Sequence, residues 1–194
     1  MSILNKGDNV VVQDPSYPIH HYAPLIAGAN VIKIECLSSE NFLNNLNTTL
    51  TSQKVKAVLV SFPHNPTTLT VNQEFYDELV NLARRYNFLI INDFAYSDIY
   101  FNEEKPPSLL NSDPQFDHTV ELYSLTKGYS MAGWRVGFAV GNESAISSLT
   151  KLKSYIDYGT FQPIQIASTV AINELDDYPK AVSYTHLRAH ETLQ

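Results

Sequence analysis

Two cations, Lys127 and Arg135, lie in a segment of otherwise small and apolar residues, SLTKGYSMAGWRVGF (residues 124–138). A lysine shielded from water is a good nucleophile toward aldehydes. An arginine offers a planar fork of donors that fits a phosphate. Ser124 precedes the lysine by three residues and can donate its hydroxyl to the same phosphate. The segment therefore predicts a site for a ligand that carries both an aldehyde and a phosphate.

Further polar and aromatic residues follow other apolar runs: Tyr17 in DPSYP, Asn65 in PHNPTT, and Asp93 with Tyr96 in NDFAY. An aspartate can pair with a ring nitrogen, and an amide and a phenol can bond a ring oxygen. Tyr17 could lay its ring against a flat ligand. In pyridoxal phosphate, an acidic partner keeps the pyridine nitrogen protonated so that the ring acts as an electron sink. Together these groups predict pyridoxal phosphate as the cofactor.

Each residue taken alone also has a plain structural interpretation. A single lysine is usually a solvated surface charge, and an arginine in a strand usually faces solvent or pairs with a carboxylate. Asp93 could cap the next helix, Asn65–Pro66 could be only a turn, and Tyr17 could be an ordinary turn aromatic. His20 and His21 are expected at the surface or one layer behind the ligand-binding side chains. The joint occurrence of the groups at successive strand ends favours the site.

Short apolar runs alternate with helical patterns along the chain. Apolar and β-branched residues predict strands at residues 9–14, 30–36, 56–62, 88–93, 119–125 and 134–141. Apolar residues at helical spacing predict helices over 72–86, from Asn142 onward, and over 165–175. This alternation predicts an α/β fold, a mostly parallel sheet with helices on both faces. Ligands of such sheets lie beyond the carboxyl ends of the strands, where the candidate residues fall.

Composition narrows the class of protein. The 194 residues are 44% hydrophobic and 17% charged, which is typical of a globular domain. The formal net charge of −7 argues against nucleic acid as a partner, since phosphate backbones need a basic face. No apolar run is long enough to cross a bilayer, so no membrane association is expected. Cys36 is the only cysteine, which fits a reducing compartment, and we expect the cytoplasm.

Both ends of the chain differ from an ordinary domain. The stretch VSYTHLRAHET (residues 182–192) resembles one reading frame of a DNA-sequencing adapter. We therefore expect residues 1–181 to be a partial domain and 182–194 to be a non-native tail. His186 and His190 have the i, i+4 spacing of a metal pair, but they fall in this tail, and we expect no metal site. A strand follows within a few residues of Met1, as though the chain began inside a domain.

The motifs resemble those of the fold-type I, class I/II aminotransferases from about Asp8 to about Leu175. SLTKGYSMAGWRVGF resembles the lysine signature of that family, NDFAY its Asp-x-x-Tyr segment, and DPSYP the stretch whose aromatic ring stacks on the cofactor. PHNPTT resembles its Asn-Pro-Thr-Gly corner, with Thr68 in place of the glycine. The resemblance implies the large-domain core of the fold-type I pyridoxal-phosphate-dependent transferases.

The resemblance also implies a role for each matching residue. Lys127 would form the Schiff base with the cofactor and shuttle a proton, and Asp93 would pair with the pyridinium nitrogen. Asn65 and Tyr96 would bond the phenolic oxygen, and the Asn65–Pro66 peptide is a candidate cis bond. The phosphate and the ring face would be held by the remaining three residues, Ser124, Arg135 and Tyr17.

The residues of these motifs are most similar to those of the alanine–glutamate transaminase branch. This similarity implies transfer of an amino group between alanine and a 2-oxo acid such as 2-oxoglutarate. LL-diaminopimelate and aspartate aminotransferases remain alternatives, as does a pyridoxal-phosphate-dependent lyase or decarboxylase on the same scaffold. A non-enzymatic alternative is the cofactor-binding domain of a transcription regulator. Relatives are homodimers, so residues 157–163 are expected to face a partner subunit. We expect the chain as it stands to bind the cofactor weakly and to be inactive.

Overall fold

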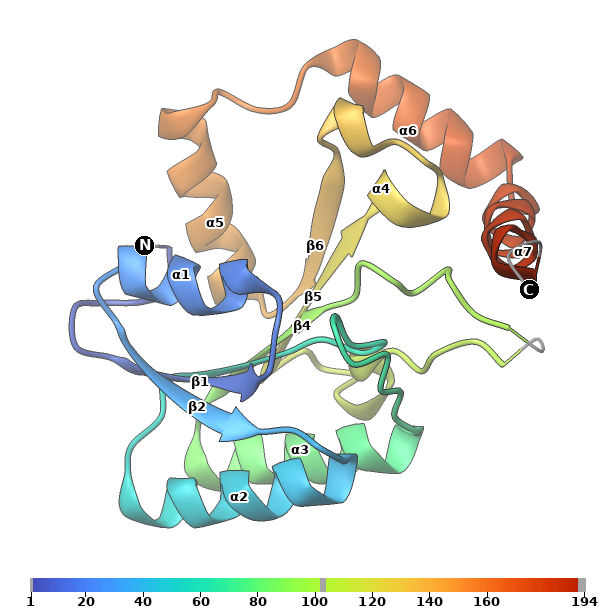
Figure 1. Ribbon diagram of the computed structural model, residues 1–194. Coiled ribbons are helices and arrows are strands. Elements are labelled where there is room, and N and C mark those ends of the chain that lie inside the picture. The colour runs from blue at the N-terminus through green and yellow to red at the C-terminus, as the bar shows by residue number, and fades with distance from the viewer. Residues whose placement is uncertain (1, 102–103, 192–194) are drawn as a thin grey trace.

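A six-stranded sheet with the order β2-β1-β3-β4-β5-β6 forms the centre of the molecule (Figure 1). The computed structural model describes residues 2–101 and 104–191, with residues 186–191 as backbone only. Strands β1 to β5 are parallel and β6 runs antiparallel to β5. The strands are Asn9–Asp14 (β1), Asn30–Glu35 (β2), Ala57–Val60 (β3), Leu89–Asp93 (β4), Thr119–Ser124 (β5) and Gly137–Gly141 (β6). The predicted mostly parallel α/β fold is confirmed.

Helices lie on both sides of this sheet, with α2 and α3 on one side and α1 and α5 on the other (Figure 1). The α-helices are Pro18–Ile26 (α1), Ser39–Ser52 (α2), Gln73–Tyr86 (α3), Leu125–Gly128 (α4), Glu143–Ile156 (α5), Gln162–Glu174 (α6) and Tyr178–Glu191 (α7). Two short 3-10 helices are Leu109–Ser112 (η1) and Ala132–Trp134 (η2). The predicted helices correspond to α3, α5 and α6, and the sequence reading missed α1, α2, α4 and α7.

The face covered by α2 and α3 holds the main hydrophobic core. Ser38 and Asn72 begin the two helices by accepting hydrogen bonds from backbone amides of the first turn. Each helix then presents apolar residues at helical spacing to the sheet. The fully buried members of this core include Phe42 and Leu46 of α2, Phe75 and Leu79 of α3, and Val11, Val58 and Ile90 of the strands. This packing fixes the positions of β1, β3 and β4.

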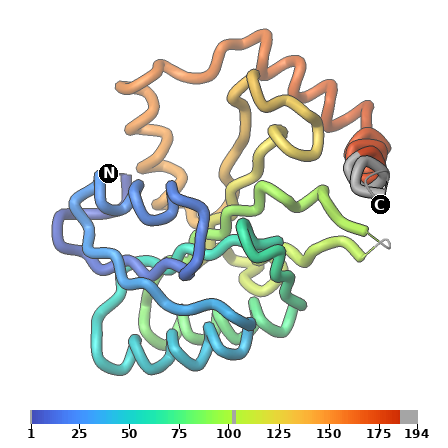
Figure 2. Tube along the Cα trace, viewed as in Figure 1, coloured from blue at the N-terminus to red at the C-terminus, as the bar shows by residue number. Residues whose placement is uncertain are grey.

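The β5–β6 side of the molecule is packed more loosely. Phe138 and Val140 of β6 are 47% and 40% exposed, although both are apolar strand residues. Farther along, Tyr155 and Ile166 are 76% and 58% exposed on α5 and α6. Figure 2 shows the chain from α5 through α6 running along the periphery of the molecule to α7. This region therefore carries apolar side chains without a covering layer in the described part of the chain.

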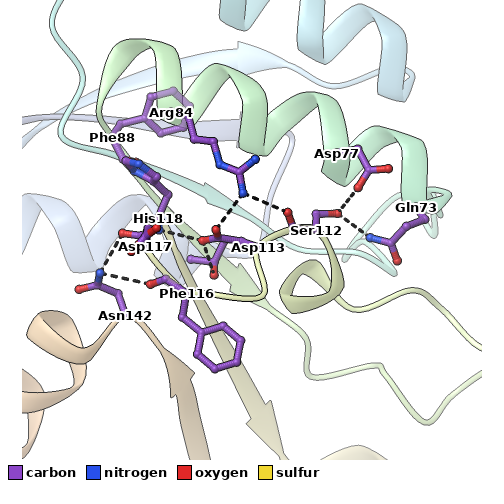
Figure 3. A network of polar contacts seen from close by, with 11 residues as sticks. Gln73, Asp77, Arg84, Phe88, Ser112, Asp113, Phe116, Asp117, His118 and Asn142 are labelled. Carbon is purple, nitrogen blue, oxygen red and sulfur yellow. Dashed lines mark hydrogen bonds and ion pairs between the residues drawn. The ribbon is translucent and has the colours of Figure 1, made fainter.

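A network of polar contacts joins the two regions at the amino ends of the parallel strands (Figure 3). Asp113 is fully buried, and its carboxylate accepts from Arg84 Nη2 at 3.1 Å, from the backbone N–H of His118 at 2.8 Å and from the Thr119 hydroxyl at 3.2 Å. Asn142, which caps α5, donates to the backbone oxygen of Asp117 at 2.8 Å. The network thereby anchors the start of β5 and the end of β6, at the edge opposite to the candidate site.

Candidate functional site

The carboxyl end of β1 delivers Tyr17 and His20 to the site. Pro18 occupies the first turn of α1, where its fixed φ favours helix initiation and its missing N–H costs nothing. Tyr17 immediately precedes this helix and is 47% exposed. His20 lies one turn into the helix, with its ring edge-on to that of Tyr17 at a centroid distance of 5.9 Å. The start of α1 thus presents an aromatic face to the open edge of the sheet.

His20 contacts the aspartate that the sequence singled out. Its Nε2 atom lies 2.8 Å from Oδ2 of Asp93, the last residue of β4. His20 is 3% exposed, so its expected place one layer behind the ligand-binding residues is supported, and the surface alternative is wrong. The other oxygen, Oδ1, accepts from the backbone N–H of Ala95 at 3.3 Å. Two groups therefore hold this carboxylate in place at the end of its strand.

The turn after β3 presents Asn65. The Asn65–Pro66 peptide is cis, as the resemblance implied. Thr68 replaces the glycine of the family motif, and its φ of 61° is the left-handed conformation that glycine adopts readily. His64 is buried and its Nδ1 atom lies 2.6 Å from the hydroxyl oxygen of Thr67. Burial, followed by the charge of the nearby His20, lowers the pKa of His64 below its ordinary value.

Tyr96 connects the asparagine to the lysine. Its phenol oxygen lies 3.5 Å from Asn65 Nδ2, and its ring centroid lies 5.5 Å from Lys127 Nζ. An ammonium group at this distance from an aromatic face is attracted by the negative potential of the ring. The structure therefore brings Asn65, Tyr96 and Lys127, from three different strand ends, to the same place.

Ser124 is the last residue of β5, and Arg135 lies in the connection that leads into β6. Ser124 caps α4, its hydroxyl accepting from the backbone N–H of Thr126 at 3.2 Å, and it faces Gly137 across the pair. Arg135 lies two residues before Gly137 in the chain and has a φ of 53°. A non-glycine residue in this conformation is strained, and such strain is concentrated at functional sites. The guanidinium is exposed, and Nη1 donates to the backbone oxygen of Ala132 at 3.1 Å.

All seven predicted residues lie at the carboxyl edge of the parallel strands, as expected. Direct contacts link Asn65 to Tyr96 and Tyr96 to Lys127, whereas no contact joins Ser124 to Arg135 in the described structure. Lys127 is exposed rather than enclosed.

The kinds of group present fit pyridoxal phosphate. The amine can take its aldehyde, the carboxylate its ring nitrogen, and the phenol with the amide its ring oxygen. The guanidinium with the hydroxyl can take its phosphate, and the exposed aromatic ring can cover its ring face. Asp93 in particular has a carboxylate fixed at a strand end but still 27% exposed, so that it can accept a further hydrogen bond. In the described residues, no group of three or more His, Cys, Asp or Glu could hold a metal ion, and the side chains of His186 and His190 lie outside that description.

His20 is the residue of the candidate site whose place the sequence predicted least clearly. Its partner Asp93 lies 73 residues away in the chain, so no local pattern reveals the pair. A local signal did exist, because Pro18 after an extended residue favours a helix start and would place His20 one turn later, near Tyr17.

No helix in the described part of the chain is long and apolar enough to cross a membrane.

Comparisons with known proteins identify relatives of this chain. The glutamate-pyruvate aminotransferase AlaC of Escherichia coli (strain K12) is 39% identical over the whole chain, which covers 47% of that protein. An LL-diaminopimelate aminotransferase of Nitratidesulfovibrio vulgaris (strain DP4) is 37% identical over 99% of the chain and 50% of its own length. The substrate-bound BacF structure from Bacillus subtilis superposes with a TM-score of 0.86 at 30% identity, over 94% of this chain and 47% of that one.

The chain thus spans about half the length of the curated relatives that it matches. The relatives belong to a pyridoxal-phosphate-dependent family, which agrees with the cofactor that the residues predicted. The family model for class I and II aminotransferases matches residues 1–190. The chain therefore belongs to the class I and II aminotransferase family.

Proposed function

We propose that the full-length protein containing this chain is a pyridoxal-phosphate-dependent aminotransferase. The observation that carries the proposal is the contact of Tyr96 with both Lys127 and Asn65, beside an Asp93 carboxylate held by His20. These groups come from separate strand ends and meet at one edge of the sheet. Bound pyridoxal phosphate supplies an electron sink that stabilises negative charge on a substrate carbon.

The residues of this chain have distinct proposed tasks. Lys127 attaches the aldehyde through its amine and, once released, carries a proton to and from the substrate carbon. Asp93, oriented by His20, keeps a proton on the ring nitrogen. Asn65 and Tyr96 bond the ring oxygen.

Two further tasks complete the proposed site. Ser124 and Arg135 hold the phosphate, with the hydroxyl and the guanidinium as charge-assisted donors. Tyr17 covers one face of the ring.

For the substrate, we propose alanine as the amino donor and 2-oxoglutarate as the acceptor. This choice rests on the similarity to the glutamate-pyruvate aminotransferase of Escherichia coli. The LL-diaminopimelate aminotransferases among the relatives favour a second candidate substrate, LL-diaminopimelate. Assays of the full-length protein with each donor would separate the two, because the favoured donor should show the larger kcat/KM.

The central test is Lys127→Ala in the full-length protein. Wild type should show a visible absorption band that borohydride removes, and the variant should lack the band and lose at least about 1,000-fold in turnover. Lys151→Ala, which removes an exposed lysine from α5, is the matched control and should behave as wild type. A band that persists in Lys127→Ala would contradict the proposal.

We also propose that the full-length protein is a homodimer and that residues 157–163 face the partner. Tyr158 and Phe161 support this, since they are 92% and 69% exposed although both are large aromatics. Sedimentation of the full-length protein should give a dimer that Tyr158→Ser with Phe161→Ser weakens. An unchanged dimer in that double variant would contradict the proposed surface.

We further propose that residues 1–181 are part of a cofactor-binding large domain and that 182–194 are non-native. The resemblance of residues 182–192 to adapter sequence supports this boundary. The uninterrupted gene should read differently from residue 182 onward. The 194-residue chain alone should show no measurable transamination, because the relatives are about twice its length.

A further inference from the structure

The turn that carries Lys127 is too short to hold its own position. Helix α4 spans only Leu125–Gly128, and its backbone bonds run from the N–H groups of Tyr129 and Met131 to the oxygen of Leu125, at 3.2 and 3.3 Å. A single helical turn is not stable by itself, because few hydrogen bonds offset the ordering of its residues. The placement of the lysine must therefore depend on neighbouring side chains.

Asp98 is wedged against this turn. A Cβ atom built on Gly128 would lie 2.9 Å from both Cβ and Oδ2 of Asp98. No residue other than glycine fits at position 128 unless Asp98 moves. The φ of Gly128 is not in the left-handed region, so space and not backbone conformation accounts for the glycine.

Asp98 is itself fixed from the sheet. The hydroxyl of Tyr123, in β5, donates a short hydrogen bond to Asp98 Oδ2, and the Tyr123 ring stacks on Phe138 of β6 at 4.7 Å. Burial, followed by the bond to Asp98 and its charge, raises the pKa of Tyr123, so the phenol remains a donor across the physiological range. The carboxylate thus lies between Tyr123 of β5 and the lysine turn.

The same loop also contacts the lysine head group. Tyr96, two residues before Asp98, places its ring 5.5 Å from Lys127 Nζ. Backbone bonds from Ser97 to Phe94 and from Ile99 to Tyr96, both at 3.1 Å, make this loop a pair of tight turns. One short segment after β4 therefore contacts the turn of Lys127 at its backbone and at its amine.

We propose that Asp98 is a positioning residue that fixes the backbone of the Lys127 turn through its contact with Gly128 and its bond to Tyr123. The importance of this role for catalysis rests on the proposed function, in which Lys127 attaches the cofactor. The contact itself does not depend on that function.

The test is a double-mutant cycle in the full-length protein without cofactor. The variants are Asp98→Ala, Gly128→Ala and the two combined, with Gly133→Ala as the matched control, since a Cβ there meets nothing within 4 Å. Each protein is labelled briefly with acetic anhydride, and mass spectrometry gives the labelling rate of Lys127 relative to that of Lys33. A general loss of stability would lower the melting temperature without changing this ratio in the native state.

The two single variants should each change the Lys127 ratio by at least about threefold, whereas the double variant should match Asp98→Ala alone. Asp98→Asn keeps the shape and the acceptor for Tyr123, so its ratio should stay closer to wild type than that of Asp98→Ala. Wild-type ratios in both single variants, or a double variant equal to the product of the singles, would overturn the proposal. If Gly128→Ala fails to fold, the double variant must fold, and its failure would also overturn it.

Cofactor binding gives the second measurement. Borohydride trapping of pyridoxal phosphate on Lys127 should weaken in Gly128→Ala, and in the double variant it should equal that of Asp98→Ala alone. If the wild-type protein traps no cofactor, the proposed function fails, while the labelling ratio still decides the role of Asp98.

Discussion

The two sides of this molecule differ in how far their apolar residues are buried. Around β1, β3 and β4, helices α2 and α3 bury residues such as Phe42 and Leu79 completely. Around β6, α5 and α6, large apolar side chains such as Phe138 and Ile166 remain about half exposed. The first region has the packing of a finished core, whereas the second has the surface of an interface. Residues 157–163, which were proposed above to face a partner subunit, lie in this second region, from the end of α5 to the first turn of α6.

The site lies on the border between these regions, which explains an unexpected feature. Asp93 and Asn65 come from the well-packed side, and Lys127 and Arg135 come from the exposed side. The sequence indicated a lysine shielded from water, yet Lys127 is exposed in this chain. The described residues therefore do not supply the shielding that the sequence predicted.

The largest expected effect contrasts one apolar residue from each region. Phe42→Ala should lower the free energy of unfolding by about 3–5 kcal/mol, because it leaves a cavity in a closed core. Ile166→Ala, on the exposed side, should change it by less than about 0.5 kcal/mol. Urea unfolding followed by circular dichroism measures both. Equal losses would show that the two regions do not differ as described.

The polar network between the regions gives the next largest effect. Asp113→Asn should cost about 2 kcal/mol, because a fully buried carboxylate that accepts from Arg84 and from two other donors is replaced. Asp117→Asn changes an exposed carboxyl group nearby and should cost less than about 0.5 kcal/mol. The same unfolding assay applies. A small effect at Asp113 would mean that the network does not hold the regions together.

Acidification should lower the free energy of unfolding through His64, which is buried in the turn after β3. Burial lowers the pKa of His64 below 6.5, so as the pH falls the unfolded chain takes up the proton before the folded one. The stability that neutral His64 contributes is complete above pH 6.5 and is lost below it, by at most about 1.4 kcal/mol per pH unit. Unfolding between about pH 7.5 and pH 5.5 should therefore show a smaller loss in His64→Gln than in wild type. His21, whose pKa is also lowered by burial, keeps a residual slope in the variant. Identical slopes would rule out a contribution from His64.

The smallest expected effect is a stabilisation. Thr68 is exposed and has a φ of 61°, so Thr68→Gly relieves strain and loses no buried contact. The gain should be about 0.5–1 kcal/mol after the greater chain entropy of glycine is subtracted. Thr70→Gly, in the same turn but not at a left-handed position, should not stabilise. A melting-temperature shift distinguishes the two, and a decrease in Thr68→Gly would contradict the strain argument.

Much of the fold could be predicted from local patterns. All six predicted strands occur, because apolar β-rich runs bounded by turns leave little choice. The largest error in a strand boundary is the start of β6, predicted at Trp134 but found at Gly137, because residues 132–134 form a 3-10 helix and Arg135 adopts a left-handed conformation. Helix α2 was missed although Phe42, Leu46 and Leu50 have helical spacing, since its many Asn and Thr residues suggest a loop.

The site residues were predicted at the correct edge of the sheet, because the carboxyl ends of the parallel strands all lie there. Their contacts could not be predicted. The bond of His20 to Asp93 and that of Tyr123 to Asp98 join residues 73 and 25 positions apart, and only the packed sheet brings them together. The roles of Lys127, Asp93 and the other site residues therefore remain proposals to be tested as described.

The separation of the two sheet edges has a practical consequence. Every connection that carries a proposed ligand-binding group leaves a parallel strand at one edge or precedes the antiparallel strand there. Connections such as the exposed segment 53–54, between α2 and β3, lie at the other edge of the sheet. An affinity tag, a fluorophore or a surface tether inserted at that segment should leave the chemistry accessible, so the protein can be immobilised in a known orientation.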